Sequence, residues 1–298
     1  MAWTYEAMAL GAAACWAVAS LSAAPASAHL GAVAFTRWRM LFASVLLVSL
    51  ATWRDGWSTL PSSGLGVLAL SGFIGIFLGD SALFACMNRL GPRRAGVLFA
   101  THALFSAVLA WWWLGDSLSG LVLWGTVLMV TGVMLAIALG KRRGETHHWE
   151  QVHGRWWVGV ALGLTAALGQ SVATLMLKPL MATGVDPVAA SAVRMLAALS
   201  AHAVLRAGGA GVSKAQNPLT AGVLWRTAWN ASLAMGLGMT LILWALQGGS
   251  ASLVAVWSSV TPVLLLPLLW LIYRRQPPLG AWVGAGLTVV GGAAILLR

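Results

Sequence analysis

The chain has few charged residues and almost no acidic ones. Of its 298 residues, 8% are Asp, Glu, Lys or Arg, and only 7 are acidic. A soluble globular chain carries about a quarter charged residues, so a surface that faces water on all sides is excluded, and a soluble enzyme with it. The 59% hydrophobic content instead indicates a multi-pass membrane protein.

The basic residues do not point to nucleic acid. Lys and Arg outnumber Asp and Glu by 18 to 7, which gives a net charge of +11. They are scattered between apolar runs, however, and form no basic stripe of the kind that binds phosphates. We therefore expect no nucleic-acid partner.

Cysteine is also scarce, and the sequence contains no recognisable catalytic or metal-binding motif. Cys15 and Cys86 both lie inside apolar runs, as small buried hydrophobic residues do, so neither a disulfide nor a metal site is expected. Gly79-Asp80 resembles the Gly-Asp of intramembrane aspartyl proteases, but no second aspartate lies within a span to share its proton. We expect no enzyme activity and no cofactor. The first residues lack a basic region, so no cleaved signal peptide is expected.

Ten apolar segments are long enough to cross a bilayer as helices. About 20 residues are needed for this, and the runs are too long for barrel strands and lack alternation. The expected spans are 4–24, 30–52, 64–87, 94–114, 119–140, 156–178, 187–206, 228–247, 250–272 and 279–297. Turn residues separate them, among them Pro25 and Gly91-Pro92.

The longest polar stretch, 141–155, divides the chain almost in half. His147 and His148 within it could bind a metal, but a solvated charged loop accounts for them. The predicted domains are a first five-helix repeat (1–140), a charged linker (141–155) and a second five-helix repeat (156–298).

An internal repeat relates the two halves. An offset of 159 pairs Leu78-Gly79 with Leu237-Gly238, Asn88 with Gln247 and Gly132 with Gly291, and a slightly smaller one pairs Arg39-Met40-Leu41 with Arg194-Met195-Leu196. Because five is odd, two such halves insert in opposite orientations, as in many secondary transporters. The predicted fold is therefore all-α and membrane-embedded, with ten transmembrane helices as two inverted five-helix repeats around a central cavity.

Several motifs are shared with a known family. They are Trp38-Arg39-Met40-Leu41, Val193-Arg194-Met195-Leu196, Leu90-Gly91-Pro92-Arg93-Arg94-Ala95, Leu114-Gly115-Asp116 and Thr261-Pro262-Val263. Over its whole length the chain resembles the drug/metabolite transporter superfamily in its ten-helix EamA-type branch. Two positions depart from the family pattern: His102 stands where a proline is common, and Arg274-Arg275 replaces a Gly-acid step. Thr261-Pro262-Val263 and Lys178 are similar to YddG-type exporters of aromatic amino acids.

The resemblance implies a secondary transporter of a bacterial inner membrane. It would export small amphipathic metabolites, foremost amino acids, by alternating access between the repeats. Because the predicted cavity walls carry no carboxylate, we expect transport without coupling to an ion gradient. We expect a monomer whose partners are the small-molecule substrate and membrane lipid. Two alternatives stay open: a proton-coupled multidrug transporter for organic cations, and a non-transporting membrane scaffold or channel.

Polar and aromatic residues within the spans indicate where a substrate would bind, because polar groups in hydrocarbon are costly and face an interior. His102 and Ser106 are four residues apart and share a helix face, and the offset pairs His102 with Thr261. The predicted substrate-binding residues are His102, Gln170, Trp16, Trp257, Ser258, Thr261, Ser106 and Trp244. Helix packing remains an alternative for the serines and threonine, and equally for His102 and Gln170. A lipid-facing position remains an alternative for Trp244.

Arg39, Arg194 and Asp80 are predicted to have structural or gating roles. Each arginine lies seven or eight residues into its span, and Asp80 is the only clearly embedded acid. The repeat predicts the two arginines in opposite leaflets, away from one central site. Capping of helix ends or snorkelling is therefore favoured over contact with a substrate carboxylate.

The loop charges predict the orientation in the membrane. With ten spans both termini lie on one side. Loops on that side carry Arg54, Lys178 and Arg298, and the opposite loops carry Arg89, Arg93, Arg94, Lys141, Arg142, Arg143, Arg155, Arg206, Lys214, Arg226, Arg274 and Arg275. The positive-inside rule places both termini outside the cytoplasm. The resemblance implies cytoplasmic termini, and we follow the charges.

Overall fold

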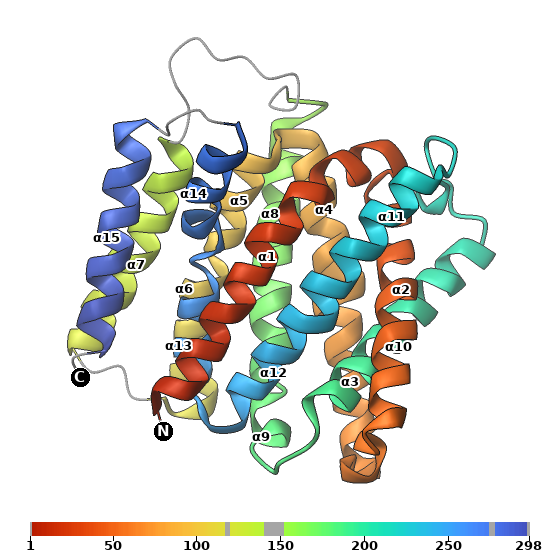
Figure 1. The fold of residues 1–298 in the computed structure, drawn as a ribbon, viewed down its shortest axis with the longest axis horizontal. Helices are drawn as coiled ribbons and strands as arrows, with labels where there is room; N and C mark the ends of the chain where they lie inside the picture. The colour runs from red at the N-terminus through yellow and green to blue at the C-terminus, as the bar shows by residue number, and fades with distance from the viewer. Residues whose placement is uncertain (1, 117–119, 140–151, 274–277, 297–298) are drawn as a thin grey trace.

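The computed structural model describes residues 2–116, 120–139, 152–273 and 278–296. Over these residues the chain is helical, and nine helices are long and apolar enough to cross a membrane, with Leu279–Ile295 as a shorter tenth. Both chain ends lie at one end of the bundle (Figure 1). The predicted ten-helix, all-α membrane fold is confirmed. Residues 141–151 of the predicted linker, with His147 and His148, lie outside the described residues.

The first half contains five spans. They are α1 (Ala2–Leu30); α2 (Ala32–Trp53); α3 (Leu65–Gly72) with η3 (Phe73–Asp80) and α4 (Ser81–Leu90); α5 (Pro92–Ala100) with α6 (His102–Leu109) and η4 (Ala110–Leu114); and α7 (Gly120–Ala138). The short 3-10 turns η1 (Gly56–Thr59) and η2 (Ser62–Gly64) join the second span to the third.

The second half repeats this order. Its spans are α8 (Trp156–Leu175) with α9 (Lys178–Met181); α10 (Pro187–Ala207); α11 (Ala221–Asn230) with η7 (Ala231–Gly238) and α12 (Met239–Gly248); α13 (Ala251–Ser258) with α14 (Thr261–Tyr273); and α15 (Leu279–Leu296). The 3-10 turn η6 (Gly211–Ser213) lies in the loop before α11.

Two of the predicted span boundaries are wrong. Pro25 does not end the first span but lies inside α1. The chain turns instead at Gly31, whose φ of 83° is in the left-handed region that favours glycine. The eighth span begins at Ala221 rather than 228, because the Thr220 hydroxyl caps α11 by accepting from the backbone N–H of Val223 at 3.3 Å.

Two irregularities recur at equivalent places in the halves and support the internal repeat. The third span of each half contains a π-helical segment of 8 residues, η3 and η7. The fourth span breaks just before His102, and its counterpart breaks just before Thr261, the residue that the offset pairs with His102. α1 runs away from the chain ends and α8 runs toward them (Figure 1), so the halves are inverted.

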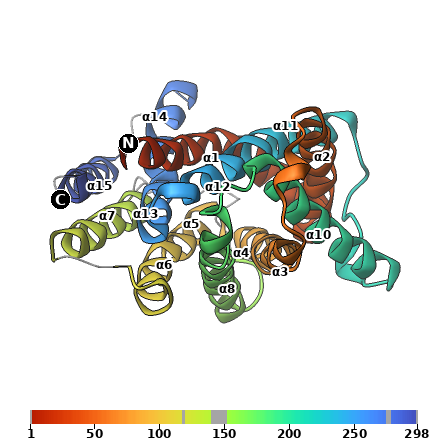
Figure 2. The same cartoon turned by 90° about the horizontal axis from the view of Figure 1, so that it is seen from below.

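The helices form two layers, and each layer mixes the two halves (Figure 2). α1 packs on α11, η7, α12, α13 and α14, and α8 packs on η3, α4, α5 and α6. We call the first group the α1 layer, and the second group, with α3, the α8 layer. The pairs α2–α10 and α7–α15 close the two edges.

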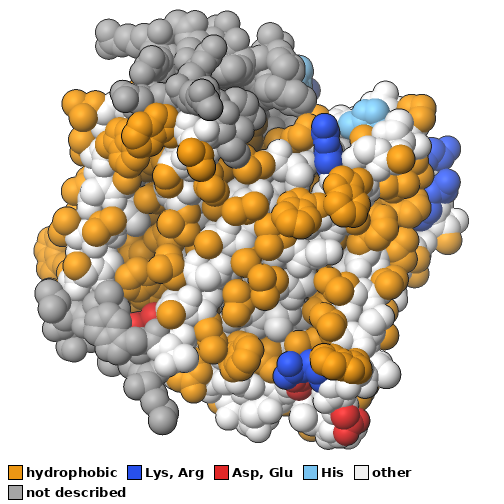
Figure 3. Space-filling view, viewed as in Figure 1, with side chains coloured by type: hydrophobic (Ala, Val, Ile, Leu, Met, Phe, Trp, Pro, Cys, Tyr) orange, Lys and Arg blue, Asp and Glu red, His pale blue; other side chains and the backbone are white. Residues whose placement is uncertain are grey.

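The surface fits a membrane environment. Apolar side chains cover the middle of the face in Figure 3, whereas charged side chains gather toward its two ends. Large apolar residues are widely exposed on the outside, among them Trp124 at 75% and Leu271 at 78%. Such exposure is unfavourable in water and favourable against lipid.

Candidate functional site

A cavity of about 370 Å³ opens between the two layers at the end of the bundle opposite the chain termini. We call it the vestibule. Its lining residues are Ala24, Ala28, Met87, Asn88, Pro92, His153 and Gln216. The first two belong to α1, and the next three belong to α4 and α5 of the other layer, so the vestibule lies on the boundary between the layers.

Short side chains and one polar link shape the vestibule. Ala24 and Ala28 are four residues apart on one face of α1, so this wall has no bulky side chain. Asn88 connects the layers, because its Nδ2 donates to the Ser27 carbonyl at 3.1 Å and its Oδ1 accepts from the Ser27 hydroxyl at 3.2 Å. Next to this link, the backbone N–H of Gln216 donates to the Leu30 carbonyl at 3.1 Å.

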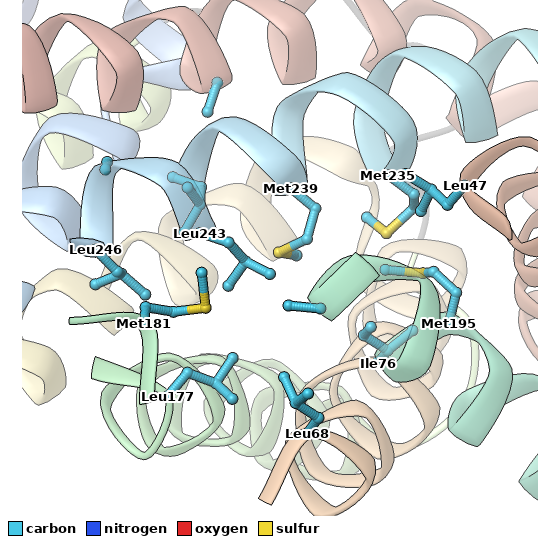
Figure 4. Close-up of a cluster of buried hydrophobic side chains, with 14 of the residues drawn as sticks. Leu47, Leu68, Ile76, Leu177, Met181, Met195, Met235, Met239, Leu243 and Leu246 are labelled. Atoms are coloured by element: carbon cyan, nitrogen blue, oxygen red, sulfur yellow. The ribbon is translucent and has the colours of Figure 1, made fainter. Parts of the chain in front are cut away.

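Apolar side chains fill the space between the layers (Figure 4). The cluster reaches the end that carries the termini, where α9 lies and α12 ends (Figure 1). We call this cluster the seal. Its labelled members are Leu47, Leu68, Ile76, Leu177, Met181, Met195, Met235, Met239, Leu243 and Leu246, and all are buried. Four of them are methionines, whose flexible side chains adapt to changing partners.

Polar contacts join the layers at the sealed end. The Asp116 carboxylate, in the loop after the fourth span, accepts from the hydroxyls of Ser250 and Ser252 at 2.6 and 3.0 Å. Both serines lie at the start of α13 in the α1 layer. Lys178 of α9 donates to the Leu246 carbonyl of α12 at 2.8 Å. The sealed end is therefore closed by both apolar packing and hydrogen bonds.

The repeat places one amide link at each end of the bundle. Gln247, which the offset pairs with Asn88, donates from Nε2 to the Val185 carbonyl at 3.0 Å. Asn88 makes the same kind of bond to Ser27 at the vestibule. In each half, the amide at the end of the third span thus binds a carbonyl near the end of the first.

The structure places several predicted site residues around the break in the fourth span. α6 packs on both α8 and α13, and the Ser171 hydroxyl of α8 donates to the His102 carbonyl at 2.8 Å. His102, Ser106, Gln170 and Ser258 are buried. Among the described residues the Ser106 hydroxyl has no hydrogen-bond partner, whereas Gln170 donates to Thr174 and Thr261 to the Ser258 carbonyl.

The three predicted tryptophans do not form one wall. Trp16 donates from Nε1 to the Ala234 carbonyl of η7 at 2.9 Å, which ties α1 to its own layer. The Trp257 ring packs near Gly292 of α15, and its buried Nε1 has no partner among the described residues. Trp244 is 44% exposed and is not part of the seal.

Two of the predicted charged residues pair, and the third lies against the same span; the expected positions of the two arginines in opposite leaflets stay a prediction. Arg39 Nη1 and Asp80 Oδ2 form an ion pair at 2.9 Å, and Arg194 Nη2 lies 3.5 Å from the position that a Cβ would take at Gly75 of η3. The sequence contains no local signal for this cluster, since its members come from α2, η3 and α10.

Comparisons with known proteins agree with this architecture. A model of the EamA-like transporter family matches residues 3–138 and 157–297. A crystal structure of a protein with 16% sequence identity superposes with a TM-score of 0.77, covering 100% of this chain and 98% of that one. A search of curated protein sequences gives no match.

Proposed function

Because the chain belongs to the EamA-like transporter family, we propose that it exports small amphipathic metabolites, foremost amino acids, by alternating access. The main support is an asymmetry between the two ends of the bundle. The layers are separated by the vestibule at one end and pack together in the seal at the other. Rocking of one layer against the other closes the vestibule end and opens the sealed end. The repeats are residues 1–140 and 156–298, joined by 141–155. One chain contains both layers, so a monomer suffices.

The buried charges favour a zwitterionic or neutral substrate over an organic cation. A transporter of cations needs a carboxylate that is free to pair with its cargo. Among the described residues, Asp80 is the acidic residue in the middle of a span, and its carboxylate is already paired with Arg39 at 2.9 Å. The same pairing disfavours Asp80 as a proton carrier, so the proposed transport runs down the substrate gradient without ion coupling.

Counterflow and net uptake in proteoliposomes test this function. The purified protein is expected to exchange labelled amino acids and to show no uphill accumulation under an imposed proton or sodium gradient. Accumulation driven by either gradient would contradict uncoupled transport. Exchange of organic cations without amino acids would support the multidrug alternative, and no exchange of either would support a scaffold.

The charge distribution gives the proposed direction. Basic residues at the vestibule end include Arg37, Arg89, Arg93, Arg94, Arg155, Arg206, Lys214 and Arg226, whereas the other end carries Arg54 and Lys178. By the positive-inside rule the vestibule faces the cytoplasm. Substrate would enter there and leave through the sealed end, which is the direction of export across a plasma membrane.

A reporter fusion checks the orientation. A reporter that is active only in the cytoplasm is expected to stay silent when fused to the C-terminus, because both termini lie outside by the charge count. The same reporter fused after Arg143, which the count places on the opposite side, is expected to be active. A strong C-terminal signal would reverse the orientation and the direction of export.

His102 is predicted to be a polar anchor for substrate. His102→Leu is expected to leave the fold intact and to slow transport about tenfold, the effect of losing one buried hydrogen bond, and His102→Gln is expected to be milder. Initial transport rates at matched protein amounts check this. If both variants transport like the parent, His102 is a packing residue and the substrate binds elsewhere.

A further inference from the structure

Two arginines and one aspartate share a buried position between the vestibule and the seal. Arg39, Asp80 and Arg194 are 5%, 8% and 1% exposed. Two guanidinium groups and one carboxylate leave a net charge of +1 away from water. Because an uncompensated buried charge is strongly unfavourable, this cluster favours the arrival of one more anionic group.

The guanidinium groups also have unused donors. Nε and Nη2 of Arg194 and Nε of Arg39 are buried without a hydrogen-bond partner among the described residues. Each buried donor without a partner costs free energy. Arg194 therefore offers two adjacent N–H groups on one edge of its planar fork, the geometry that binds a carboxylate through two parallel hydrogen bonds.

The cluster and the vestibule share the third span. Asp80, Phe84 and Asn88 are spaced four apart and share one face of the third span, and Asn88 lines the vestibule. Phe84 is buried between them, with Phe35 against its ring at 4.8 Å and the Arg39 guanidinium 5.1 Å from its centroid. Along this face, Phe84 lies between the vestibule residue Asn88 and the ion pair of Asp80 with Arg39.

We infer that Arg194, assisted by Arg39, binds the carboxylate of the transported molecule after Phe84 moves aside. The substrate class is then small molecules with a free carboxylate, amino acids among them. One bound carboxylate brings the cluster to neutrality and satisfies the free N–H groups of Arg194. This inference rests on the proposed transport function and specifies which part of the substrate the protein recognises.

The probes that test it are L-phenylalanine and L-leucine, each compared with its carboxamide. The amide keeps the side chain and the amine but lacks the negative charge. The purified parent protein is expected to bind the acid at least about tenfold more tightly than the amide, measured by the concentration dependence of the thermal shift. Equal affinity for acid and amide would overturn the inference and leave the transport function standing. Binding of neither would overturn both.

Substitutions assign the preference to Arg194. Arg194→Gln is expected to remove the preference for the acid, and Arg194→Lys, which keeps the charge but loses the planar fork, to fold and to weaken acid binding about tenfold. The control is Arg37→Gln, because Arg37 donates to the Ser213 carbonyl in a loop and is expected to keep the parent's preference. If Arg194→Gln retains the preference, or if Arg194→Lys binds the acid like the parent, the inference is wrong.

Discussion

Asp80→Asn is expected to lower the free energy of unfolding by about 3 kcal/mol or more relative to the parent protein. The substitution keeps the size of the side chain but removes the carboxylate that pairs with Arg39 at 2.9 Å, the one ion pair that either arginine makes among the described residues. Two buried guanidinium groups are then left without a counter-charge. Breaking a buried pair by removing one partner is strongly destabilising, because the remaining charge is still away from water.

The measurement is denaturant or thermal unfolding of the purified protein in detergent. The matched control is Asp55→Asn, because Asp55 is exposed in a loop with φ of 54°, a conformation that asparagine adopts readily. The control is expected to stay within about 0.5 kcal/mol of the parent. Similar stability of the two variants would show that Asp80 does not hold the arginines.

The second large effect is expected at the edge where α7 meets α15. A Cβ at Gly284 would overlap the backbone nitrogen of Ala136 and lie 2.6 Å from the Gly132 carbonyl oxygen. Backbone atoms cannot move aside as a flexible side chain can. Gly284→Ala is therefore expected to force the helices apart and to lower the free energy of unfolding by about 2–3 kcal/mol.

Gly286, two residues further along α15, provides the control. A Cβ there meets nothing within 4 Å, so Gly286→Ala is expected to be neutral or to stabilise by up to about 1 kcal/mol, the usual gain for alanine over glycine in a helix. Opposite signs for the two variants in the same unfolding assay support the close packing. Equal effects would contradict it.

The spans and the repeat could be predicted because they depend on local sequence. Apolar length alone finds the helices. The offset that pairs His102 with Thr261 also pairs the residues at which α6 and α14 begin. The end of the first span was predicted wrongly at Pro25. A proline inside a long membrane helix is tolerated when neighbouring helices satisfy the freed backbone groups.

The pairing of charges could not be predicted in the same way. Arg39 and Arg194 are equivalent by the repeat, but the partner of Arg39, Asp80, has no equivalent acid in the second half, where Met239 takes its place at the offset of 159. The π-helical segment η3, which ends at Asp80, changes which face its residues occupy relative to an α-helix. The substrate-binding roles proposed for His102 and its neighbours stay predictions.

Alternating access is tested most directly by locking the sealed end. Asp116→Cys and Ser250→Cys, in a protein with Cys15→Ala and Cys86→Ala, replace side chains whose oxygens lie 2.6 Å apart across the layers. A short bis-methanethiosulfonate reagent, which joins the two thiols through disulfides and releases methanesulfinate, is expected to abolish amino-acid counterflow in proteoliposomes. Reduction is expected to restore it, and each single-cysteine protein is expected to be unaffected. Counterflow at the same rate in the cross-linked and reduced protein would contradict transport by separation of the two layers.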